Sequence, residues 1–81
     1  MKKITKEDVL ALREELLQYA EKAEQHEYPR ILLKHMFLEC AIAHFEKLSM
    51  KELNTIFRCV CRLIGKDYSE YKETTENKKE E

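Results

Sequence analysis

The chain has 81 residues, of which 43% are hydrophobic and 38% are charged, and its formal net charge is −1. A chain of this length forms one small domain with a thin core, which leaves little room for a deep pocket. A net charge near zero excludes a bulk electrostatic attraction to nucleic acid or to anionic membranes. Only one glycine and one proline are present, so long helices with tight connections are expected.

The first helix is predicted over about residues 5–27. Thr5 can cap the backbone N–H of Asp8, and Ile4 before the cap can pack against Val9. One face of this helix collects the residues expected in the core, which are Val9, Leu12, Leu16, Tyr19, Ala20 and Ala23. Pro29 suits the first turn of a second helix, so the first helix is expected to end before it.

The second helix, from about 29 to 47, is apolar around most of its circumference. Its apolar residues are Ile31, Leu32, Leu33, Met36, Phe37, Leu38, Cys40, Ala41, Ile42, Ala43 and Phe45. Only a wedge with His35, Glu39 and Glu46 is expected to face solvent. Such a helix must be covered on more than one side, either inside a bundle or in an oligomer interface. Its charged residues exclude a membrane span.

The third helix is predicted over residues 50–64. Ser49 and Glu52 form an S-x-x-E capping box, and Gly65 suits a left-handed C-terminal cap. The fold predicted from the three helices is an all-α, up-down-up three-helix bundle over residues 1–72. Residues 73–81 form a charged tail that we expect to be mobile, after a short turn from Asp67 that docks Tyr68 or Tyr71.

The three cysteines raise the question of a metal or redox site. Cys40 and His44 share a helix face, but they supply only two of the four ligands that a structural zinc needs, so both are interpreted as residues at the edge of the core. Cys59 and Cys61 point about 160° apart on a helix and cannot grip one ion. We therefore expect no cofactor and no metal, and a metal or thiol-redox switch through Cys59 is the third functional hypothesis. An odd number of thiols indicates a reducing compartment, which places the protein in the cytoplasm.

No catalytic constellation is recognised. With a single glycine the chain lacks a phosphate-cradling loop. Ser49 is better used as a helix cap and Ser69 as a surface residue than as nucleophiles, and His35 with Glu39 is interpreted as a surface pair. The sequence therefore predicts that the protein is not an enzyme.

Apolar residues outside the core stripe of the first helix indicate a docking surface. Leu10 and Leu17 lie off that stripe with Arg13 between them, and Phe37 or Phe45 would add to the surface if the second helix is incompletely covered. The predicted function is protein binding, as a small adaptor, inhibitor or regulator that contacts another protein or a second copy of itself. The open alternative is that Leu10 and Leu17 pack internally against Tyr28, Tyr68 or Tyr71.

A basic stripe on the third helix supports a rival function. Lys51, Arg58 and Arg62, with Asn54 and Thr55 nearby, are expected to line the polar side of this helix and to contact phosphates. The alternative function is therefore a nucleic-acid-binding transcriptional regulator. Phosphate binding weakens steeply as salt rises, whereas docking of a helix face changes little, so salt dependence separates the two hypotheses.

Overall fold

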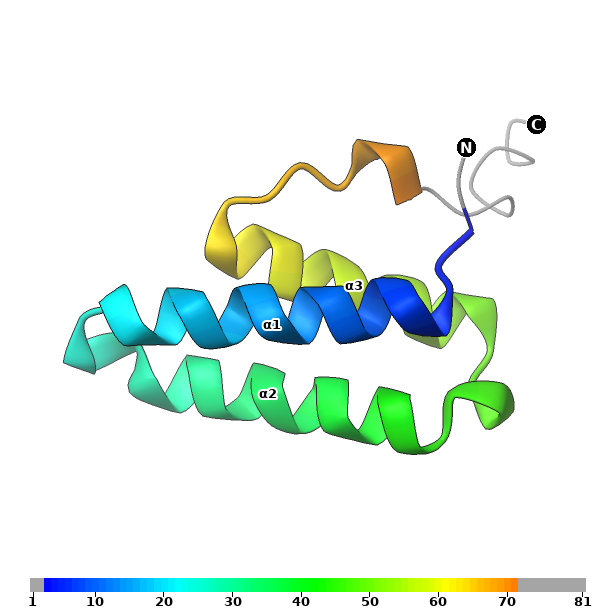
Figure 1. Ribbon diagram of the computed structural model, residues 1–81, viewed down its shortest axis with the longest axis horizontal. Coiled ribbons are helices and arrows are strands. Elements are labelled where there is room, and N and C mark those ends of the chain that lie inside the picture. Colours follow the sequence, from blue (N-terminus) through cyan, green and yellow to red (C-terminus); the bar gives the residue numbers. More distant parts are fainter. Residues whose placement is uncertain (1–2, 72–81) are drawn as a thin grey trace.

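The chain folds into three consecutive antiparallel helices in this computed structural model, which describes residues 3–71 (Figure 1). The helices are α1 (Lys6–Lys22), α2 (Tyr28–Ala43) and α3 (Met50–Ile64). Short 3₁₀ turns occupy Gln25–Glu27, Phe45–Lys47 and Ser69–Tyr71, and the described residues contain no strand. The predicted all-α, up-down-up three-helix bundle is confirmed. The tail expected at 73–81 lies outside the described residues.

Local capping signals fix two helix starts at the residues that the sequence indicated. At α1 the Thr5 hydroxyl accepts a hydrogen bond from the Asp8 N–H, and the Asp8 carboxylate accepts one from the Thr5 N–H. Ser49 and Glu52 form the same reciprocal pair at α3. Each pair satisfies donors that a helix N-terminus otherwise leaves unpaired.

The first two helices are shorter than the sequence indicated. α1 ends at Lys22 because Ala23 adopts an extended backbone (φ −77°, ψ 157°), and the next residues form a separate 3₁₀ turn. α2 ends at Ala43 because His44 leaves the helical region (φ −121°, ψ 32°). The 3₁₀ turns Gln25–Glu27 and Phe45–Lys47 follow these two helices. Their residues are of the same types as those in the helices, so the sequence did not indicate where each α-helix ends. At α3 the end is clear, since Gly65 takes the left-handed conformation (φ 77°).

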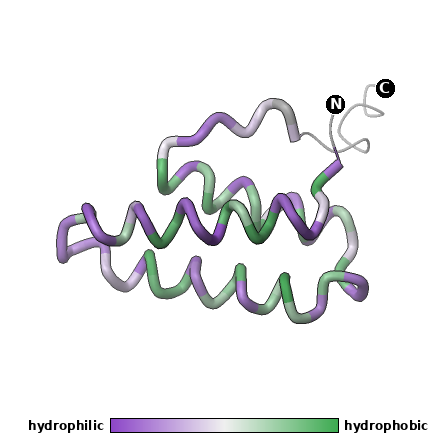
Figure 2. The backbone as a smooth tube through the Cα atoms, in the orientation of Figure 1, coloured by the Kyte–Doolittle hydropathy of each residue, from purple (hydrophilic) through white to green (hydrophobic). Residues whose placement is uncertain are grey.

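One hydrophobic core joins the helices. Its buried members are Ile4, Val9, Leu12, Leu16, Ile31, Leu38, Ala41, Leu53, Phe57, Val60, Cys61 and Tyr71. The hydropathy tube in Figure 2 shows hydrophobic residues on all three helices and a hydrophilic connection between α1 and α2. Each of the three helices packs against the other two, so the core lies between them.

The segment after α3 folds back over that helix. This C-terminal strap, defined as residues 66–71, runs above α3 in Figure 1, on the side of the bundle opposite α2. Tyr71 is 6% exposed, and its ring centroid lies 4.6 Å from that of Phe57. The Tyr68 ring lies 6.3 Å from the same Phe57 ring. At the start of the strap, Lys66 Nζ donates to Glu15 Oε2 of α1 at 2.7 Å. The strap therefore covers one side of the core.

Candidate docking surface on α2

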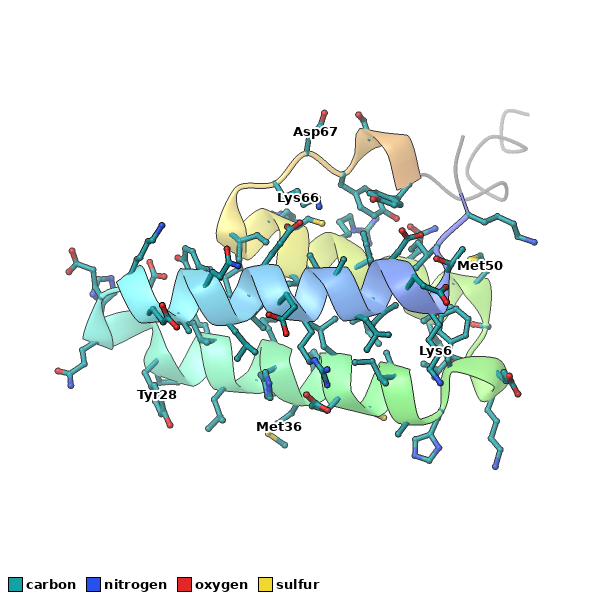
Figure 3. All side chains as sticks on the ribbon, in the orientation of Figure 1. Lys6, Tyr28, Met36, Met50, Lys66 and Asp67 are labelled. Carbon is teal, nitrogen blue, oxygen red and sulfur yellow. The ribbon has the colours of Figure 1, made fainter. Side chains whose placement is uncertain are left out.

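One side of α2 exposes a continuous row of apolar side chains. Five large ones, between 39% and 61% exposed, are Tyr28, Leu32, Leu33, Met36 and Phe37. The row continues along the helix through two smaller exposed residues, Cys40 and Ala43. At about 100° per residue these positions share one side of the helix. We call these seven residues the outer α2 face. Figure 3 shows Tyr28 and Met36 pointing away from α1.

The rotation of α2 explains why this side is exposed. Glu39 lies on the side toward α1, where its carboxylate accepts from Arg13 Nη1 at 3.1 Å. His35 Nε2 lies 3.4 Å from the same carboxylate. Of the wedge that was expected to face solvent, Glu46 is exposed, the Glu39 side chain remains 45% exposed beside Arg13, and only His35, at 32%, is more covered. The buried residues of α2 are Ile31, Leu38 and Ala41, and the apolar side opposite them is turned outward.

Glu39 lies at the margin of the outer α2 face, where its carboxylate pairs with Arg13 of α1. At one margin Lys34 Nζ lies 5.9 Å from the centre of the Phe37 ring, and at the N-terminal end Tyr28 and Pro29 line an open depression together with Gln25 and His26. Aromatic side chains each present about 150–250 Å², so five large side chains at roughly half exposure leave on the order of 500 Å² of apolar surface. That is the upper range of patches found on monomeric proteins.

The residues predicted to bind a partner fall in different environments. Phe37 belongs to the outer α2 face, and Leu17 of α1 is 41% exposed. Leu10 is half-buried, Arg13 pairs with Glu39, and Phe45 packs against the core after α2 has ended. The larger part of the exposed apolar surface is thus formed by Leu32, Leu33 and Met36, which the sequence analysis did not select. Their helical spacing was visible in the sequence, but every other side of α2 was also apolar.

The alternative that Leu10 and Leu17 pack internally against Tyr28, Tyr68 or Tyr71 stays a prediction for Leu10, which is half-buried, whereas Leu17 is 41% exposed. Tyr68 and Tyr71 lie against Phe57 of α3, and Tyr28 is 61% exposed.

The expectation that a turn after Asp67 docks Tyr68 or Tyr71 is confirmed, since Asp67 accepts hydrogen bonds from the N–H and the hydroxyl of Ser69 at 3.0 and 3.1 Å. Both bonds lower the pKa of Asp67 below its ordinary value.

The basic stripe lies on the outer side of α3. Lys51, Arg58 and Arg62 are all exposed, with exposed Thr55 between them. Asn54 does not belong to this stripe, contrary to the sequence analysis, because it is 4% exposed and lies on the core side of the helix. Three cations on one helical side over about three turns form a surface that phosphate groups can contact.

The cysteines lie in three different environments. Cys40 and His44 are exposed, so their assignment to the edge of the core was wrong; the outward rotation of α2 carries both of them to the surface. Cys61 is buried in the core and Cys59 is half-buried. Within residues 3–71 no three His, Cys, Asp or Glu side chains lie close enough to hold one metal ion.

Burial raises the pKa of the Cys61 thiol from 9.0 to about 11. The folded state therefore keeps a proton that the unfolded chain loses as pH rises through 9, so the free energy of unfolding must fall with pH in this range. We expect a loss of roughly 1 kcal/mol between pH 8 and pH 10, measured by urea unfolding at both values.

The control for this measurement is Cys61→Ala. Its free energy of unfolding should be lower at both pH values because the core is less well packed, but it should change much less between pH 8 and pH 10. The pKa of Lys66 is also raised, chiefly because Glu15 accepts its hydrogen bond. The stability contributed by the Lys66 ion pair is lost only above the ordinary lysine pKa of about 10.4, which lies outside the range from pH 8 to pH 10. An undiminished pH difference in Cys61→Ala would assign the effect to other groups.

None of the helices between residues 3 and 71 has the length and hydropathy needed to cross a bilayer. Comparison of the chain with protein-family models, curated proteins and solved structures found no match. The outer α2 face, the basic stripe and their chemistry are therefore the basis for a functional conclusion.

Proposed function

We propose that the protein is a small non-enzymatic protein-binding module, an adaptor, inhibitor or regulator, whose docking surface is the outer α2 face. The observation that carries this proposal is the orientation of α2. Ile31, Leu38 and Ala41 are buried while Leu32, Leu33 and Met36 are turned outward. An apolar patch of this size is often a functional surface. A helix face in a partner's groove is a common recognition mode.

The environment of the cysteines supports a cytoplasmic setting for this function. All three described thiols are free, and an exposed Cys40 within a docking surface is preserved best in a reducing compartment. The third hypothesis, a metal or thiol-redox switch through Cys59, stays a prediction, since Cys59 is half-buried. Cys61 is less suited to that role, because burial raises its pKa and keeps the unreactive thiol form at neutral pH.

A second candidate function is nucleic-acid binding through Lys51, Arg58 and Arg62. It is favoured by the exposure of all three on one side of α3. The outer α2 face ranks first because a solvated basic side is ordinary on a helix, whereas an exposed apolar side along a whole helix is not.

The proposal is tested by capture from a native lysate with the tagged full chain. A double variant, Leu32→Glu with Met36→Glu, should lose the captured proteins, because each carboxylate would have to be buried in an apolar contact. Ala11→Glu adds the same charge to an exposed position of α1 away from this face and should behave like the parent chain. The bound proteins are identified by mass spectrometry.

The same capture at two salt concentrations separates the two functions. Proteins held by the outer α2 face should stay bound between about 50 mM and 500 mM salt, whereas nucleic acid held by the basic stripe should be released. Capture that survives in the double variant but disappears in high salt and in Arg58→Glu with Arg62→Glu would reject docking through α2 in favour of the basic stripe.

A further inference from the structure

We infer that the occupant of the outer α2 face is a second copy of this chain, with the two α2 helices packed antiparallel about a twofold axis at Met36. The inference rests on the proposed function, since it names the partner of the same face. It is carried by the area of the face, by the distribution of large and small residues along it and by the positions of its neighbouring charges.

The area suits a dimer of small subunits. A stable interface buries about 800 Å² on each partner, and the five large side chains alone offer on the order of 500 Å². Cys40, Ala43 and the margins of the helix supply further area when two copies meet. Residues 72–81 contain no apolar side chain that could cover the face.

The small residues of the face lie only in its C-terminal half. Tyr28, Leu32 and Leu33 lie in the N-terminal half, and Phe37, Cys40 and Ala43 lie in the C-terminal half. Met36 is at the middle of α2, which spans 16 residues. In an antiparallel pair centred on Met36, Leu32 of one copy therefore lies opposite Cys40 of the other. Large residues then fill the space left by small ones, as close packing requires.

A parallel pair would place equal residues at the same level. Leu32 would meet Leu32 and Ala43 would meet Ala43, so the contact would be crowded at one end and hollow at the other, which close packing disfavours. In the antiparallel pair each Arg30 lies at the level of the C-terminal turn of the other α2, where the helix dipole favours a positive charge.

The first measurement is the mass of the purified full chain by light scattering and sedimentation under reducing conditions, from about 1 µM to 1 mM. Twice the monomer mass is expected in the upper part of this range. The Leu32→Glu, Met36→Glu variant should raise the dimer dissociation constant by at least about tenfold, because carboxylates from both copies would meet at the axis. The Ala11→Glu control should not change it. A chain that stays monomeric throughout overturns the inference.

Disulfide crosslinking then tests the antiparallel register. Met36→Cys in a Cys40→Ser, Cys59→Ser background should give a covalent dimer on oxidation, because residue 36 faces its equivalent at the axis. Native Cys40, in a Cys59→Ser background, should not crosslink. The two Cys40 positions are eight residues apart along the antiparallel pair, about 12 Å at 1.5 Å per residue, whereas a disulfide spans about 4.4–6.8 Å between Cα atoms. Leu32→Cys with native Cys40 should crosslink again.

The outcomes separate this inference from the function on which it rests. A dimer that crosslinks through Cys40 alone indicates a parallel pair and overturns the register. A monomer whose captured proteins are still lost in the Leu32→Glu, Met36→Glu variant keeps the docking function and rejects the second copy. A monomer whose capture is unchanged by that variant rejects both proposals.

Discussion

Ending the chain after Asp67 should lower the free energy of unfolding by about 3–5 kcal/mol, the usual loss when a buried aromatic side chain is removed. This truncation removes Tyr68 and Tyr71. Tyr71 is 6% exposed and its ring contacts Phe57 at 4.6 Å between centroids, so both rings lose their packing partner. Stable small domains have about 5–15 kcal/mol in total, so the truncated chain should be close to unfolding at room temperature. Urea unfolding followed by circular dichroism measures the effect.

A second truncation provides the control. Ending the chain after Lys72 keeps both tyrosines, and we expect it to stay within about 0.5 kcal/mol of the full chain, as the charge-rich composition of the removed segment indicates. Tyr71→Ala in the full chain should reproduce most of the larger loss, and Tyr71→Phe should lose much less because it keeps the ring. A chain ending at Asp67 that is as stable as the one ending at Lys72 would show that the strap contributes nothing to the core.

The fold could be predicted because its signals are local. A capping box involves residues three apart, so Thr5 with Asp8 and Ser49 with Glu52 mark helix starts whatever the helices later contact. Gly65 marks the end of α3 in the same way, by the left-handed conformation that glycine adopts without strain. Three such helices with short connections leave few arrangements other than an antiparallel bundle.

The docking surface could be predicted only in part, because the rotation of α2 is a tertiary property. Periodicity identifies the buried side of a helix when the opposite side is polar. In α2 the only polar wedge contains His35 and Glu39, and an isolated helix would turn it toward water. Arg13 lies 26 residues away from Glu39 in the chain and pairs with it. The rotation follows from the side of α2 that packs into the bundle, with Ile31, Leu38 and Ala41, and the sequence pattern of α2 alone does not identify that side.

Asn54 shows the same limit in a single residue. A lone amide close to Lys51, Thr55 and Arg58 in the sequence was assigned to the polar side of the helix. The wheel position of Asn54 is, however, one turn before Phe57, and the structure buries both. The polar residues next to Asn54 in the sequence therefore did not indicate its side of the helix, because a helix separates consecutive residues by about 100°.

Replacing Asn54 by Leu should raise the free energy of unfolding by about 1–3 kcal/mol, the range associated with an unpaired buried polar group. Within the described part of the chain, neither Nδ2 nor Oδ1 of Asn54 has a hydrogen-bond partner. Folding therefore removes the amide from water without replacing its hydrogen bonds. Leucine has the same number of heavy side-chain atoms and the same branching at Cγ, it forms helices more readily, and it can pack in the site as an apolar residue. The measurement is urea unfolding of the two chains side by side.

Thr55→Leu separates this effect from helix propensity. Thr55 is the exposed neighbour of Asn54 in α3, so its replacement gains propensity without relieving a buried amide and should change stability by less than about 0.5 kcal/mol. Asn54→Asp is the opposite test. An ionised carboxylate in the same site should destabilise the fold strongly at pH 7 and less at pH 4, where protonation removes the charge. A loss of stability in Asn54→Leu would show that the amide is hydrogen-bonded in solution, and that the polar side chain is part of how α3 packs.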